Sequence, residues 1–103
     1  MTARHMAVAH LLRSTAQAHH RAFAATRGQD SHWPEWYARE LDAPLSSLLG
    51  STVESGYLAT ALRTLDDEMR RRAPTTDWTL YYADQLVQRF GPRSTWDRLA
   101  SMV

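Results

Sequence analysis

Apolar side chains recur every three or four residues along most of this chain, which is the spacing of one face of an α-helix. The pattern predicts a long helix over residues 3–27, ended by Gly28, and a second long helix that follows Ser51 and ends near Arg72. No segment has the strict two-residue alternation of a half-buried strand. The expected fold is therefore all-α.

An aromatic stretch at residues 33–41 returns in altered form at residues 78–86. On a helix, the aromatic positions of each stretch share one face, which must be buried against something. Both stretches are therefore expected to form amphipathic helices whose rings lie near the joint between the two halves of the chain. The two faces consist of Trp33, Trp36 and Tyr37 in the first stretch and Trp78, Tyr81 and Tyr82 in the second.

Residues with strong preferences for helix ends divide the first half of the chain. Thr2 is suited to cap the first helix, and Ser31 is expected to cap the first aromatic helix. Pro34 is tolerated there because the first amides of a helix need no helical partner. Residues 42–44 end in a proline and should stop this helix, so residues 45–49 are expected to form a separate short helix.

Similar signals divide the second half. Ser51 and Glu54 have the spacing of a capping box for the second long helix. Thr76 or Asp77 is expected to cap the second aromatic helix. A last short helix should open at Ser94.

The order of long, aromatic and short helix occurs twice. Residues 8–50 and 54–99 are therefore candidates for a duplicated three-helix unit related by a pseudo-twofold axis. Short amphipathic helices also resemble one another by chance, so two unrelated halves are the alternative. Either case predicts a single-domain bundle over residues 1–103, with two long and three to four short helices.

Composition narrows the class of protein. A chain of 103 residues with 44% hydrophobic residues suffices for one core, and the lack of cysteine excludes disulfides and thiolate metal sites. The formal charge of +1 argues against a nucleic-acid partner. No apolar run approaches the roughly 20 residues that span a bilayer, so we expect no membrane association. The N-terminus lacks an apolar signal segment, and a cytoplasmic location is expected.

His19 and His20 form the most distinctive polar pair, and Asp66 lies midway along the other long helix. Histidines and a carboxylate together can hold iron or zinc. Adjacent helical residues point about 100° apart, however, and no metal-ligand spacing occurs here, so no metal is expected. The simpler interpretation puts His19 at the core edge with a hydrogen-bonded partner and His20 in solvent. Asp66 is also expected to pair with Arg70, one helical turn away.

The aromatic faces have two interpretations. Pockets between bundle helices combine aromatic walls with a few polar tips such as tyrosine hydroxyls. Aromatic rings at helical spacing also bury well in an ordinary core, which is the simpler interpretation. No cofactor is indicated, and no catalytic residue is assigned because nucleophile elbows, phosphate loops and zinc-protease motifs are absent. Candidate ligand-binding residues are His19, His20, Trp33, Trp36, Tyr37, Trp78, Tyr81 and Tyr82.

Residues 19–38 carry the pattern His-His-x-x-Tyr/Phe, a turn, and then Trp-x-x-Trp-Tyr-Ala. This pattern resembles a small helical module found in stand-alone bacterial proteins and in the C-terminal tails of some glyoxalase/bleomycin-resistance proteins, which belong to the vicinal oxygen chelate family. The resemblance covers about a quarter of the chain and implies a bacterial helical accessory module. The metal-binding βαβββ units of that family have no counterpart here, and Phe23 replaces the more usual tyrosine.

Two kinds of function fit these observations. The first is a non-enzymatic interaction or accessory module that binds a protein partner or forms a homodimer, and the lack of catalytic motifs favours it. It predicts an exposed apolar patch that buries about 800 Å² per partner, and no internal cavity. The second is a small-molecule-binding protein or enzyme that uses His19, His20 and the tyrosines around an interhelical pocket. It predicts a cavity of at least about 300 Å³ reached by a histidine.

Overall fold

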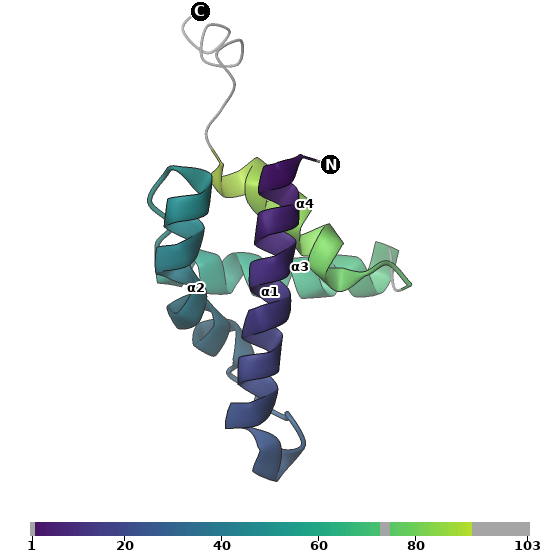
Figure 1. The fold of residues 1–103 in the computed structure, drawn as a ribbon. Helices are drawn as coiled ribbons and strands as arrows, with labels where there is room; N and C mark the ends of the chain where they lie inside the picture. Colours follow the sequence, from purple (N-terminus) through teal and green to yellow (C-terminus); the bar gives the residue numbers. More distant parts are fainter. Residues whose placement is uncertain (1, 73–74, 92–103) are drawn as a thin grey trace, which may run out of the picture.

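The fold is all-α, as the hydrophobic pattern predicts. The computed structural model describes residues 2–72 and 75–91 of the chain. No strand occurs in these residues, and none of their helices is both long and apolar enough to cross a membrane. The short helix expected from Ser94 lies outside them. The described elements are α1 (Ala3–Ala22), a short 3-10 helix (Ala24–Thr26), α2 (Trp33–Leu49), α3 (Ser55–Arg72) and α4 (Trp78–Phe90) (Figure 1).

The core consists mainly of leucines contributed by each of the helices α1 to α4. Helix α1 packs chiefly against α4, and α2 packs chiefly against α3. Figure 1 shows α3 crossing the direction of α1 instead of running parallel to it. Burial of each such side chain stabilises the fold by roughly 1.5–3 kcal/mol relative to exposure. The fully buried leucine and valine side chains are Val8, Leu12, Leu41, Leu45, Leu49, Leu58, Leu62, Leu65 and Leu86.

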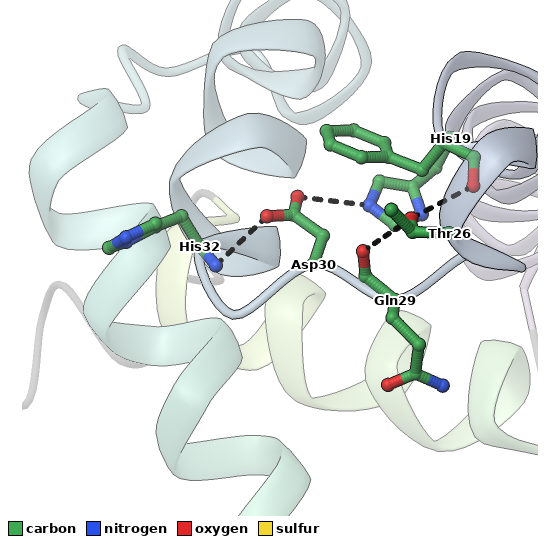
Figure 2. A network of polar contacts seen from close by, with 6 residues as sticks. His19, Thr26, Gln29, Asp30 and His32 are labelled. Carbon is green, nitrogen blue, oxygen red and sulfur yellow. Dashed lines mark hydrogen bonds and ion pairs between the residues drawn. The ribbon is translucent and has the colours of Figure 1, made fainter.

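The first helix is shorter than its sequence pattern predicts, because it ends at Ala22 and not near Arg27. The chain then tightens into the 3-10 helix and enters the left-handed region at Arg27 (φ 57°) and Gly28 (φ 82°). The Thr26 hydroxyl donates to the Gln29 carbonyl at 2.8 Å and so holds the turn closed (Figure 2). The prediction was wrong because amides of the turn, such as Gly28 N–H, which donates to the Phe23 carbonyl at 2.8 Å, bond to carbonyls that a continuing helix would otherwise pair.

The aromatic helix α2 begins at Trp33, but Ser31 does not cap it as predicted. His32 occupies the N-cap position and makes no side-chain capping bond. The Asp30 side chain supplies the acceptor instead, since its Oδ1 lies 3.0 Å from the His32 backbone N–H that donates to it (Figure 2). Pro34 lies in the first turn of the helix, as predicted.

Helix α2 continues through Pro44, where the sequence predicts a stop and a separate short helix. Proline has no N–H, so the Glu40 carbonyl loses its helical partner, but Glu40 is exposed and water can pair with that carbonyl. Continuation keeps Leu41 and Leu45 on one face, where both are fully buried. This burial outweighs the local effect of the proline, and α2 is therefore a long helix.

The capping box predicted for Ser51 and Glu54 is not formed. Helix α3 begins at Ser55, and the Ser51 hydroxyl donates to the backbone carbonyl of Phe90 at the end of α4. Ser51 therefore ties the loop between α2 and α3 to a helix distant in sequence, which local spacing does not reveal. The other end of the helix, at Arg72, agrees with the prediction.

Two of the predicted N-caps are present. Asp77 caps α4, and its Oδ1 accepts the Thr79 backbone N–H at 2.9 Å. Thr2 caps α1, and its hydroxyl oxygen accepts the His5 backbone N–H at 3.2 Å. Each cap satisfies an amide that has no partner within its own helix.

The duplication expected for residues 8–50 and 54–99 stays a prediction. Its first unit would comprise α1 and α2, and its second would comprise α3, α4 and the segment from Ser94, which lies outside the described residues. Under a twofold relation, the packing of α1 on α4 would correspond to the packing of α3 on α2. Both of these contacts occur.

Candidate functional site

A cleft of about 430 Å³ lies between the helices, beside the turn that joins α1 to α2. Each of the helices α1 to α4 contributes at least one side chain to it, and the turn contributes three residues. Segments distant in sequence therefore build the cleft together. Its lining residues are His19, Gly28, Gln29, Asp30, Trp33, Tyr37, Asp66, Met69, Trp78 and Tyr82.

His19 and Asp30 form a nearly buried polar pair in this cleft. His19 Nε2 lies 3.1 Å from Asp30 Oδ2, and each side chain is only 10% exposed (Figure 2). The turn makes this contact, because the left-handed residue Gly28 reverses the chain and returns Asp30 to the last turn of α1. Asp30 is thus fixed at both oxygens, through His19 and through the His32 amide.

The environment of Asp30 keeps its carboxyl ionised. Burial raises its pKa. Hydrogen bonds from the His19 side chain and the His32 amide, together with the charges of both imidazoles when protonated, lower the pKa by a larger amount. The net pKa is therefore below the usual value. An ionised carboxylate only accepts hydrogen bonds. His19 Nε2 must therefore carry the proton that it donates to Asp30.

Aromatic rings hold the imidazole of His19 in place on its other sides. The ring of Phe23 stacks on it with a centroid distance of 4.6 Å, and Trp36 meets it edge-on at 4.9 Å. Tyr37 lies at 5.2 Å in a tilted arrangement. His19 has little room to change its orientation, and this agrees with its predicted place at the edge of the core.

Two aromatic pairs form apolar walls of the cleft, one on each aromatic helix. Trp33 meets Tyr37 edge-to-face at 5.7 Å on α2, and Trp78 meets Tyr82 in the same way at 5.3 Å on α4. Burial raises the pKa of both tyrosines, and the charge of Asp66 raises that of Tyr82 further. Both phenols therefore stay neutral at physiological pH and present a hydroxyl group.

Asp66 is the second carboxylate of the lining and comes from the middle of α3. Its Oδ2 lies 3.1 Å from Arg70 Nη2, which is the ion pair that the sequence spacing predicts. Arg70 extends into solvent, and its side chain is 73% exposed. Asp66 therefore lines the cleft, whereas its partner Arg70 approaches it from the solvent side.

Three residues predicted for ligand binding do not line the cleft. His20 is exposed, as expected for the solvated member of the histidine pair. Trp36 packs behind the cleft against His19, and Tyr81 contacts Tyr82 at a centroid distance of 6.5 Å. The structure brings together the other predicted residues, which are His19, Trp33, Tyr37, Trp78 and Tyr82.

The metal hypothesis joined the histidine pair to the carboxylates of α3. His19 and Asp66 do line the same cleft. Within residues 2–72 and 75–91, however, no three His, Asp or Glu side chains converge closely enough to hold a metal ion. His20 points to a different environment from its neighbour because adjacent positions on a helix diverge.

Sequence reasoning missed Asp30 as a member of the site. Its signal was present but weak: an acidic residue follows Gly28 by two positions and lies eleven positions after His19. Met69, which also lines the cleft, was not among the candidate ligand-binding residues. Gly28 was expected to end α1, whereas it positions the turn that carries Asp30.

No family model matches the sequence of this chain, and neither a curated protein nor a solved structure is significantly similar to it. The resemblance of residues 19–38 to the helical module of some vicinal oxygen chelate proteins therefore stays a prediction. The geometry of the cleft is the basis for a functional conclusion.

Proposed function

We propose that this chain binds a small organic molecule in the cleft between α1, α2, α3 and α4. The observation that carries the proposal is a volume of about 430 Å³ reached by a histidine. Ligand pockets occupy roughly 300–1,000 Å³ and combine aromatic walls with a few placed polar groups. The lining has this composition, with two tryptophan–tyrosine pairs and Met69 as apolar surface. The polar side chains are His19, Gln29, Asp30 and Asp66.

The side chains of the cleft favour binding over catalysis. Covalent catalysis commonly uses Ser, Thr, Cys or Lys beside a general base, and none of these residue types occurs among the described residues that line the cleft. The acid–base groups already have partners, since His19 donates to Asp30 and Asp66 pairs with Arg70. A ligand would therefore meet a fixed, largely aromatic surface and no activated group.

The interaction-module hypothesis has less support from the described residues. Among them, the exposed large apolar side chains are Met6, at 49%, and Tyr57, at 70%. They belong to different helices, α1 and α3, and single apolar side chains on a surface are ordinary. Binding of a protein partner and formation of a homodimer stay predictions.

A thermal-shift screen tests the proposal directly. A ligand present at about 100 times its Kd stabilises a protein by about 2.7 kcal/mol, which raises Tm by several degrees for a domain of this size. The panel should contain cations, anions and neutral molecules small enough for the cleft. At least one member is expected to raise Tm in proportion to the logarithm of its concentration.

A matched pair of variants places the binding in the cleft. Met69→Trp adds a bulky ring to the lining, whereas Met6→Trp makes the same change at a half-exposed position on α1. Calorimetric titration with the selected ligand should give at least about tenfold weaker binding to Met69→Trp, since filling a cleft removes ligand contacts. Met6→Trp should bind like the wild type. A panel without any stabilising ligand, or equal affinity of both variants, would refute the proposal.

A further inference from the structure

The walls of the cleft carry four aromatic rings from two helices. Trp33 and Tyr37 come from α2, and Trp78 and Tyr82 come from α4. The face of an aromatic ring is the negative part of its quadrupole and attracts a cation within about 6 Å of the ring centre, most strongly for tryptophan. A set of such rings around one space is the arrangement that recognises quaternary ammonium groups.

The ionisable side chains of the lining reinforce this preference. Besides the two neutral phenols, they comprise two carboxylates, Asp30 and Asp66, and one imidazole, His19, which already donates to Asp30. Burial raises the pKa of Asp30, but its hydrogen bonds together with the imidazole charges lower it by more, so the carboxyl is ionised at neutral pH. Among the described residues of the lining there is neither arginine nor lysine, so a bound anion would meet the two carboxylates without a guanidinium or ammonium partner there.

Arg70 lies outside the lining but forms an ion pair with the cleft carboxylate Asp66. Its guanidinium contacts Asp66 at 3.1 Å, but the side chain is largely exposed. Exposed ion pairs of this kind contribute only about 0–1 kcal/mol because water and salt screen them. A ligand cation can therefore replace Arg70 beside Asp66 while the guanidinium returns to water.

We propose that the ligand of this cleft is a small organic cation with a quaternary ammonium group. This inference rests on the proposed function and adds the chemical class of the ligand. A trimethylammonium group has no N–H, so it requires contact with ring faces and nearby carboxylates and no additional hydrogen-bond acceptors. The carboxylates Asp30 and Asp66 supply the compensating charge, and the four rings supply the contact surface.

Three probes of nearly the same shape separate charge from size. Choline is the cation. Its neutral counterpart is 3,3-dimethylbutan-1-ol, which has a tert-butyl group in place of trimethylammonium, and the anion is 3,3-dimethylbutanoate. Calorimetric titration of the full chain at low salt should give choline binding at least about tenfold tighter than the neutral alcohol, consistent with a desolvated cation–π contact. The anion should bind more weakly than the alcohol.

Adjacent residues on α3 supply matched controls for the charge. Asp66→Asn removes a carboxylate of the cleft, whereas Asp67→Asn makes the same change at an exposed neighbour outside it. Asp66→Asn should weaken choline binding by at least about fivefold and change binding of the neutral alcohol by less than about twofold. Asp67→Asn should leave both within about twofold of the wild type.

Substitutions of Arg70 and Arg71 test the same charge effect, but here the affinity for choline is expected to rise. Arg70→Gln removes the charge that competes for Asp66 and should strengthen choline binding about two- to threefold, as expected from the small energy of an exposed pair. Arg71→Gln, at the next position, should have a smaller effect. A merely structural role for Asp66 would not produce opposite effects at Asp66 and Arg70.

The outcomes separate this inference from the proposed function. Equal or tighter binding of the neutral alcohol, or equal effects of Asp66→Asn and Asp67→Asn on choline, would overturn the cation inference. A lack of binding by all three probes would also overturn it. In each case, the thermal-shift panel and the Met69→Trp variant independently decide whether the cleft binds another class of molecule.

Discussion

The turn that carries Asp30 into the cleft depends on the left-handed conformation of Gly28. Its φ of 82° lies in a region where a residue with a Cβ loses about 1–2 kcal/mol, so Gly28→Ala is expected to lower the free energy of unfolding by this amount. The added Cβ would also lie 3.3 Å from His20 Nδ1. The exposed ring of His20 can move away, so the backbone strain sets the magnitude.

Gly56→Ala is the matched control because it makes the same chemical change inside helix α3. Its φ is not positive, and the added Cβ would make only an ordinary contact of 3.8 Å with Glu54 Oε1. Alanine is favoured over glycine in the middle of a helix by about 0.5–1 kcal/mol, and Gly56 is the second residue of α3, so this variant should be at least as stable as the wild type. The unfolding free energy of Gly28→Ala should therefore lie at least about 1–2 kcal/mol below that of Gly56→Ala.

Urea unfolding followed by far-UV circular dichroism measures this difference directly. Thermal unfolding provides a second readout, since about 1 kcal/mol shifts Tm by roughly 4–8 °C in a domain of about 100 residues. A Gly28→Ala variant as stable as the wild type would contradict the left-handed turn. The positions of Asp30 and of the cleft lining next to it would then also be wrong.

Two further predictions concern the core and the pH dependence. Leu45 is fully buried, so Leu45→Ala should lower the unfolding free energy by about 2–5 kcal/mol. Leu48 is only partly buried, so Leu48→Ala should lower it by clearly less. Equal losses of unfolding free energy in urea titrations would contradict the continuous buried face of α2. A hydrogen bond from the Thr79 hydroxyl lowers the pKa of Asp77. Burial raises the pKa of Asp30, but its hydrogen bonds and the imidazole charges together lower it by more. Their stabilisation should be present above about pH 4 and disappear as pH falls through the lowered folded-state pKa values. Asp77→Asn should therefore lose less stability than the wild type between about pH 6 and pH 3, and an equal loss would refute this assignment.

The sequence alone was sufficient to predict that the described part of the chain is helical and which faces of its long and aromatic helices are apolar, although not every helix end. Helical periodicity depends only on local geometry, so the burial of Leu12, Leu62 and Leu86 follows from spacing. Predicted aromatic residues from both halves, such as Trp33 and Trp78, also line one common space. The N-caps formed by Thr2 and Asp77 are equally local features.

The errors of sequence reasoning arise where contacts distant in sequence override local preferences. Pro44 would end a helix in isolation, but burial of Leu45 beyond it keeps α2 continuous. Ser51 has the spacing of a capping residue, yet its hydroxyl bonds to Phe90 on another helix. Neither outcome can be read from a residue and its immediate neighbours.

The sequence predicted an interhelical pocket only as one of two alternatives, and the polar side chains of the cleft could not be predicted for a related reason. Its polar chemistry depends on a turn that returns Asp30 to α1 and on the placement of Asp66 in α3 opposite the aromatic helices. Helical patterning specifies which face is apolar but not the angle at which two helices cross. A small change in that angle decides whether Trp33 and Trp78 fill a core or border a cavity.

The most direct test of the central claim is an NMR titration of the isotope-labelled chain with choline. The indole N–H signals of Trp33 and Trp78 should shift together with a single Kd, because both rings line the cleft. The signal of Trp36, which packs behind the cleft against His19, should shift much less. Unchanged Trp33 and Trp78 signals at saturating choline, or a larger shift at Trp36 than at either, would contradict binding of a cation in this cleft.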